Sequence, residues 1–193
     1  MRLLIILYLL LILSSPALAQ QIAGAAHATS GEYSIEIDKS RSELVVKHEN
    51  SVIKRYRAAT GRGGQGTKRV QGDRKTPIGV YRVVDFKDDS RFHFFMQIDY
   101  PNLLDAWYGY KNELIDASEF HEITTAVKNN QKPPQDTALG GQIGIHGIGE
   151  MNDEKRAIHA RENWTAGCIA LTNDEIIELR QYVTIGTPIV IKE

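Results

Sequence analysis

The chain contains a single cysteine, Cys168, within the stretch NWTAGCIALTND at residues 163–174. A thiol can serve as a catalytic nucleophile when three conditions are met. Its thiolate must form, a base must lie within hydrogen-bond reach, and N–H donors must face the oxyanion of the tetrahedral intermediate. Because a lone cysteine forms no internal disulfide, the alternatives for this sulfur are pairing with another chain, an inert buried position, or reactivity.

Two histidines upstream of Cys168 are candidate bases. His146 is the last residue before Gly147 in the stretch QIGIHG, in which the alternation of a predicted strand places Ile143 and Ile145 on one face and His146 on the other. A sheet holds a histidine at a strand end, and the glycine that follows leaves space beside the ring. We therefore predict His146 as the base, with a satisfied core histidine as the alternative. His159 lies in a polar connection, where it is either a second site residue or a solvated loop histidine.

The backbone beside the thiol offers candidates for the oxyanion donors. Gly167 has no side chain, so the N–H groups of Ala166, Gly167 and Cys168 can approach a substrate carbonyl closely. A zinc site made of His146, His159 and Cys168 is the alternative for these residues. It lacks a close-paired ligand motif such as C-x-x-C or H-x-x-x-H. We therefore expect no metal and no cofactor.

The elements that must position these residues are mostly strands. Alternating apolar residues predict strands and a hairpin over 33–60, with its turn at 48–51, and further strands at 81–86, 93–99 and 187–193. Helical spacing predicts a helix over 118–130, and the capping box Thr172-x-x-Glu175 predicts the start of a second. The segments 61–76 and 147–164 are predicted as an exposed loop and a polar connection. The pattern indicates one mainly-β domain over 32–193 with two or so helices.

The N-terminus indicates export. Arg2 is followed by an apolar run over 3–13 and by the A-x-A pattern of residues 17–19, which is typical of a secretory signal peptide. The alternative is a membrane anchor, but the run would span only about 16 Å as a helix, against a hydrocarbon core of about 30 Å. We predict a signal peptide over 1–19, a flexible lead-in over 20–31, and a periplasmic or cell-envelope protein with no stable membrane span after cleavage.

The charge of the chain argues against one class of partner. The formal net charge is −1 at pH 7. Removal of the predicted signal peptide takes away Arg2, which makes the net charge one unit more negative. Proteins that bind nucleic acid generally carry a basic excess that follows the phosphates. We therefore predict no nucleic-acid partner.

Four segments together resemble the L,D-transpeptidase catalytic domain (YkuD-type) family. His146-Gly147, followed by Thr165-Ala166-Gly167-Cys168-Ile169, is similar to the family's catalytic signature. GDRKTPIGVYRV at 72–83 and VTIGTPIVI at 183–191 resemble two further segments, in the same order. The form WTAGCIAL resembles a subgroup with tryptophan before the threonine. The resemblance covers nearly all of the mature chain and implies a β-sandwich or barrel-like catalytic domain.

The resemblance also implies an activity. Cys168 would attack the peptide bond after the L-centre of meso-diaminopimelate in a peptidoglycan stem peptide. Terminal D-alanine would leave, and an acyl-enzyme thioester would form. His146 would be the base and later the acid. An amine from another stem or from an outer-membrane lipoprotein would resolve the thioester, with a role in cell wall biogenesis and cell shape. Water as acceptor would make the protein an L,D-carboxypeptidase. A non-catalytic wall-binding domain is a third reading.

The sequence departs from the family pattern at two positions. Many members carry histidine or lysine where this chain has Ala166, and arginine where it has Ala170. The missing arginine removes a possible clamp for a substrate carboxylate. The basic loop 61–76, with Arg74 among its charges, would provide a rim for carboxylates, or is simply solvated.

Several other residues near the motif have two readings each. Thr165 either hydrogen-bonds near the thiolate or is a plain structural threonine. Trp164 either forms a wall of the cleft or belongs to the core. Trp107, in the long segment 100–134, either caps the cleft or packs under a helix. Gly147, or a nearby carbonyl, is expected to orient the His146 ring.

Overall fold

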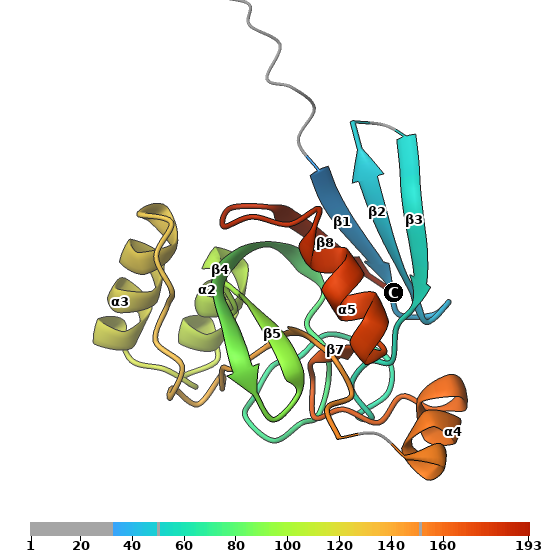
Figure 1. Cartoon of the computed structure of the whole chain (residues 1–193). Coiled ribbons are helices and arrows are strands. Elements are labelled where there is room, and N and C mark those ends of the chain that lie inside the picture. The colour runs from blue at the N-terminus through green and yellow to red at the C-terminus, as the bar shows by residue number, and fades with distance from the viewer. Residues whose placement is uncertain (1–32, 50, 151) are drawn as a thin grey trace, which may run out of the picture. The chain divides into compact units, whose positions relative to one another are not determined.

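The computed structural model describes residues 33–49, 51–150 and 152–193 (Figure 1). The predicted signal peptide and lead-in lie outside these residues. The strands are β1 Tyr33–Asp38, β2 Glu43–His48, β3 Ser51–Arg57, β4 Gly79–Ser90, β5 His93–Ile98, β6 Gly144–His146, β7 Ile169–Ala170 and β8 Pro188–Lys192. The helices are α2 Leu103–Lys111, α3 Ala117–Lys128, α4 Asp153–Arg161 and α5 Asn173–Arg180.

One long strand joins two halves of the sheet. The described strands form an eight-stranded sheet in the order β3-β2-β1-β8-β4-β5-β6-β7. The first residues of β4 pair with β8, and its later residues pair with β5. The register shifts between Val83 and Asp85, and such a bulge bends a strand and increases its twist. Figure 1 shows β4 curving from β8 towards β5.

The two edges of the sheet meet near Cys168. Just after β3, Ala59 exchanges two backbone hydrogen bonds with Ala170 of β7, at 3.0 and 2.8 Å. Gly61 forms a further bridge with Thr165. The segment that carries the thiol is therefore held from both sides, by β6 and by the chain that follows β3. The mainly-β, barrel-like fold predicted from the sequence is confirmed.

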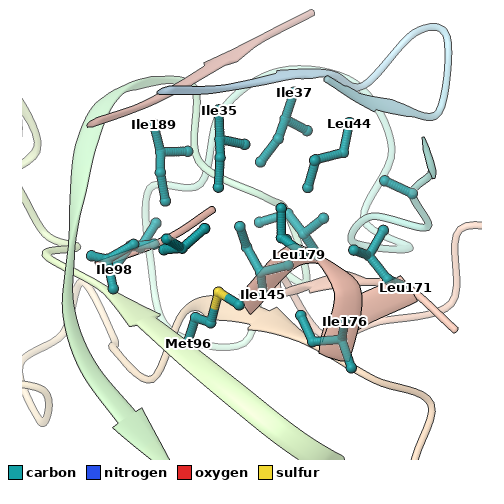
Figure 2. Packing of buried hydrophobic residues seen from close by; sticks show 14 of the residues in the cluster. Ile35, Ile37, Leu44, Met96, Ile98, Ile145, Leu171, Ile176, Leu179 and Ile189 are labelled. Atoms are coloured by element: carbon teal, nitrogen blue, oxygen red, sulfur yellow. The ribbon is translucent and has the colours of Figure 1, made fainter. Parts of the chain in front are cut away.

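The core lies between the two halves of the sheet. Because successive side chains of a strand point to opposite faces, Ile35 and Ile37 of β1 face inward together. Figure 2 shows them opposite Met96 of β5 and Ile145 of β6, with α5 contributing Leu179. All five side chains are buried, and burial of one such side chain is worth roughly 1.5–3 kcal/mol relative to exposure. This packing fixes β6, on which His146 lies.

Two of the four described helices agree with the sequence prediction. The predicted helix over 118–130 is α3. The predicted capping box at the start of α5 is present: the Glu175 N–H donates to the Thr172 hydroxyl oxygen, and the Thr172 N–H donates to the Glu175 carboxylate at 2.9 Å. Among the helices of the described residues, none combines the length and the apolar character that a membrane span requires.

The other two described helices, α2 and α4, were not predicted. In α2, Asn102 and Asp105 form the capping box, so the start signal is present in a less common pair of residues. The polar connection predicted over 147–164 is wrong for the nine residues of α4. Helix α4 buries a single residue, His159, so its sequence has no apolar stripe that would indicate a helix.

Candidate active site

A cavity of about 540 Å³ opens beside Cys168. Its lining comes from three stretches that are distant in sequence: the β4–β5 hairpin, the segment 141–146 and the segment 164–168. Of the residues predicted from the sequence, the structure brings Cys168, His146, Trp164, Thr165 and Ala166 together in this lining.

Parallel pairing of β6 with β7 places the thiol and the imidazole on one face. Ile145 is opposite Ile169, and His146 is opposite Ala170. Cys168 therefore lies level with Gly144, and the alternation of side chains puts it on the same face as His146. In this structure the described residues include no hydrogen bond between Sγ and the imidazole. The sulfur instead lies 3.3 Å from the carbonyl oxygen of Gln142, to which the S–H can donate.

The surroundings of Cys168 favour the neutral thiol over the thiolate. Burial raises its pKa to about 11, although a hydrogen bond from the Gly144 N–H and the charges of Lys68 and Arg91 act in the opposite direction. The residue as a whole is half-buried and lines the cavity. A substrate can therefore reach the sulfur, but a standing thiolate is not stabilised.

The imidazole of His146 is neutral and oriented. Its Nδ1 lies 2.7 Å from the carbonyl oxygen of Gly147. A carbonyl can only accept, so Nδ1 carries the hydrogen and Nε2 is left with its lone pair. Burial lowers the pKa of His146 to about 4, which the bond to Gly147 partly opposes. The ring is buried and stacks on Phe92, with 4.1 Å between centroids. This tautomer is the one that a general base requires.

Thr165 and Gly167 shape the turn before Cys168. The Thr165 hydroxyl donates to the carbonyl oxygen of Cys168 at 2.6 Å and accepts from the Gly167 N–H at 3.1 Å. This supports the structural reading of Thr165. Because the Gly167 N–H is engaged, the N–H groups of Ala166 and Cys168 are the remaining candidates for oxyanion donors from this turn. Gly167 has φ +133°, and a Cβ there would lie 2.8 Å from the Lys75 carbonyl oxygen.

His159 contacts the site through Trp164. It is buried on α4 and does not line the cavity. The Trp164 indole N–H donates to His159 Nδ1 at 3.3 Å, while the Trp164 ring meets His146 edge-on at 6.1 Å between centroids. Arg57 donates to the His159 carbonyl oxygen at 3.0 Å. His159 is thus placed to hold the cavity wall rather than to touch a substrate. The described residues hold no group of three histidine, cysteine or acidic side chains arranged for a metal ion.

Arg74 and Trp107 lie away from the cavity. Arg74 is exposed on the loop 61–76 and does not line it. That loop is anchored by Lys68, which is buried and 3.1 Å from Asp73. Trp107 is 53% exposed on α2 and lines a separate hollow with Leu104 and others. The structure therefore brings neither predicted residue to the thiol.

Several lining residues were not singled out from the sequence, among them Lys87, Arg91, Phe92 and Gln142. Gln142 contributes a backbone carbonyl, which any residue type could supply, and its φ of +56° gives no sequence signal. The other three lie on the β4–β5 hairpin. The sequence pattern predicts strands at both ends of this hairpin but not what the hairpin faces.

A family model for the YkuD L,D-transpeptidase catalytic domain matches residues 32–191 of this chain. The chain belongs to the L,D-transpeptidase catalytic domain family. This confirms the family predicted from the motifs. Among curated proteins, the Escherichia coli (strain K12) protein named "Putative L,D-transpeptidase YafK" is 27% identical over 146 residues, which are 74% of this chain and 42% of YafK. The chain thus spans less than half the length of the curated relatives it matches.

Solved structures of similar proteins share the fold. A variant of the helical cell shape determining protein Pgp2 from Campylobacter jejuni has a TM-score of 0.55 at 22% identity, covering 86% of this chain and 48% of that one. Bdellovibrio bacteriovorus Bd1075 has a TM-score of 0.53 at 24% identity, covering 86% and 50%. An L,D-transpeptidase from Mycobacterium smegmatis has a TM-score of 0.50 at 14% identity, covering 84% and 59%. The predicted YkuD-type fold is therefore confirmed.

Proposed function

We propose that this chain is an exported, cysteine-dependent L,D-transpeptidase that acts on peptidoglycan stem peptides through a thioester. Membership of the family gives the general activity. One observation carries the specific proposal: Cys168 and His146 line one cavity on the same face of the β6–β7 pair, with Nδ1 of His146 bonded to Gly147 so that Nε2 is available. A lipoprotein amine as acceptor is a further possibility for the same site.

The acylation step follows from the two protonation states. Nε2 of His146 takes the thiol proton as Sγ attacks the carbonyl carbon after the L-centre of meso-diaminopimelate. The new C–S bond and an oxyanion form together. When the oxyanion collapses, the C–N bond breaks and imidazolium gives its proton to the leaving amine of D-alanine. The N–H groups of Cys168 and Ala166 are the donors proposed to stabilise the oxyanion.

The second step returns the enzyme to its starting form. An acceptor amine attacks the thioester carbonyl, and Nε2 of His146 takes a proton from it. The C–S bond breaks, and the sulfur leaves as a thiol after receiving that proton. A crosslink made in this way would place the protein in cell wall biogenesis and cell shape; the similar protein Pgp2 is described as a helical cell shape determining protein. Water in place of the amine would give a tripeptide.

The deciding experiment uses a disaccharide-tetrapeptide muropeptide as donor, followed by mass analysis. We expect dimers and released D-alanine with the unaltered protein, and neither with Cys168→Ala or His146→Ala. Tripeptide without dimers, at any amine concentration, would make the protein a carboxypeptidase. Binding of the muropeptide with no turnover by the unaltered protein would support the wall-binding reading.

Export is tested separately. Expression of the full chain in a Gram-negative host and intact-mass analysis of the envelope fraction should give a protein that begins at Gln20. A protein that retains residues 1–19 and sediments with membranes would support the anchor instead.

A further inference from the structure

Two cations face the cavity from the β4–β5 hairpin. Lys87 lies on β4 and Arg91 at the turn that follows it, and both line the cavity together with Cys168 and His146. The residues that line the cavity include no aspartate and no glutamate. The described walls around the thiol therefore carry a positive charge, which favours an anionic group of the substrate.

Aromatic rings connect both cations to the imidazole. The Arg91 guanidinium lies 4.7 Å from the centre of the Phe92 ring, and Phe92 stacks on His146 at 4.1 Å. Lys87 Nζ lies 5.7 Å from the centre of the Phe95 ring, which is 6.1 Å from that of His146. Each cation is thus held over one ring that neighbours His146. Both charges lie on the His146 side of the cavity.

The charge of Arg91 reaches the reacting groups. Burial is the main cause of the low pKa of His146, and the positive charge of Arg91 lowers it further. For Cys168, burial raises the pKa, and the same charge is among the causes that act against burial. Both effects require that the guanidinium charge interacts electrostatically with groups inside the cavity. An anionic group of the substrate in the cavity would interact with the same charge.

The chemistry of the proposed reaction places an anion on this side. His146 gives its proton to the leaving amine, so the leaving residue must lie next to His146. In a C-terminal amino acid, the carbon that bears this amine also bears the free carboxylate. The carboxylate is therefore within a few ångströms of the imidazole when the proton is transferred.

We propose that Lys87 and Arg91 form a carboxylate subsite that recognises the free C-terminal carboxylate of the leaving residue. The inference rests on the proposed function for the identity of the carboxylate. The two residues would determine specificity for a leaving residue that carries a free carboxylate. Among the described residues, no other lysine or arginine lines the cavity.

The first test does not depend on turnover. Cys168 is the only cysteine, so intact mass follows its alkylation directly. We compare iodoacetate, which carries a carboxylate, with iodoacetamide, which is neutral. The alkylation ratio is the rate constant for iodoacetate divided by that for iodoacetamide. The Lys87→Gln/Arg91→Gln double variant should lower this ratio by about tenfold, equivalent to roughly 1.4 kcal/mol. The charge-retaining variant Arg91→Lys should preserve most of the ratio. An unchanged ratio in the double variant would overturn the proposal.

Lys132→Gln is the matched control. Lys132 lies 3.5 Å from Asp85 of the same hairpin but does not line the cavity. Its replacement removes one positive charge near β4 without altering the subsite, so the alkylation ratio should stay within about twofold of the unaltered protein. A loss as large as that of the double variant would show a general charge effect and would contradict a local subsite.

The second test uses two donor peptides that differ only in a C-terminal carboxylate or amide. The unaltered protein should prefer the acid by about tenfold in kcat/KM, and the double variant should lose this preference. Equal use of both peptides by the unaltered protein would overturn the subsite. No turnover of either peptide, with the alkylation ratio still dependent on Lys87 and Arg91, would instead reject the proposed function while supporting an anion site.

Discussion

At the scale of residues, burial favours the uncharged forms of both the thiol and the imidazole. Burial raises the pKa of Cys168 to about 11 and lowers the pKa of His146 to about 4. A thiolate–imidazolium pair would require the reverse order of these values. In the proposed mechanism, proton transfer to His146 would therefore accompany the attack of the sulfur on the substrate, rather than precede it.

A prediction for Cys168 follows directly from its pKa. The rate of alkylation by iodoacetamide should keep rising from pH 7 towards pH 11, because the thiolate fraction grows over that whole range. Intact mass measured against time at each pH gives the rate. The unfolded protein in urea is the control, and its thiol should titrate near the ordinary value of 9.0. A plateau below pH 8 in the folded protein would reveal a thiolate at neutral pH.

His159 offers a second prediction at this scale. Its Nδ1 accepts the indole N–H of Trp164, so His159→Leu leaves that donor without its partner. We expect a loss of roughly 1–2 kcal/mol in the free energy of unfolding. Turnover should also fall, because Trp164 lines the cavity. Urea unfolding and steady-state kinetics measure the two effects. His159→Asn, whose side-chain oxygen can take the place of Nδ1, should restore much of both.

At the scale of elements, the turn of residues 165–168 determines where the sulfur points. The Thr165 hydroxyl donates to the Cys168 carbonyl oxygen and accepts from the Gly167 N–H, and Gly167 passes close to the backbone of Lys75. The chain on either side is held by β6 and by the segment after β3. The position of the thiol therefore depends on backbone conformation more than on side-chain packing.

Gly167→Ala tests this dependence. The added Cβ would lie 2.8 Å from a backbone oxygen at a φ of +133°, so we expect a loss of about 2–4 kcal/mol in stability and a large loss of turnover. Gly64→Ala is the matched control. Gly64 also has a positive φ, +79°, but a Cβ there meets nothing within 4 Å. It should cost only about 1 kcal/mol and leave turnover unchanged. Equal costs at both positions would contradict a clash at Gly167.

The elements also show what a sequence can and cannot predict. The helix α5 was predictable because Thr172 and Glu175 form a capping box before an apolar stripe. Helix α4 was not, because it buries His159 and has no such stripe. Residue type and motif spacing predict Cys168 and His146 as the nucleophile and the base, and both line the cavity. Gln142 was not, since its contribution is a backbone carbonyl. Lys87 and Arg91 were missed because the packing of the hairpin against the site is a long-range contact.

At the scale of the whole molecule, burial shifts several groups in the same direction. Burial raises the pKa of the Cys168 thiol to about 11 and raises those of the phenols of Tyr56, Tyr81 and Tyr100 above their ordinary value of 10.0. These side chains belong to different parts of the fold, and the three tyrosines are buried. The folded protein therefore binds protons more tightly than the unfolded chain at alkaline pH.

The stability of the fold should consequently decline above pH 9. A group whose pKa is raised by folding favours the folded state at lower pH, and its contribution is lost as pH rises from the unfolded to the folded pKa. For Cys168 that window runs from 9.0 to about 11, and the tyrosines extend it upward. Each linked proton changes the free energy of unfolding by at most about 1.4 kcal/mol per pH unit.

Urea unfolding between pH 8 and 11 measures the slope. Cys168→Ser removes one such proton, so its curve should be flatter than that of the unaltered protein between pH 9 and 10, before the tyrosines contribute most. Parallel curves would mean that folding does not raise the pKa of the thiol, and the neutral resting site inferred above would be wrong.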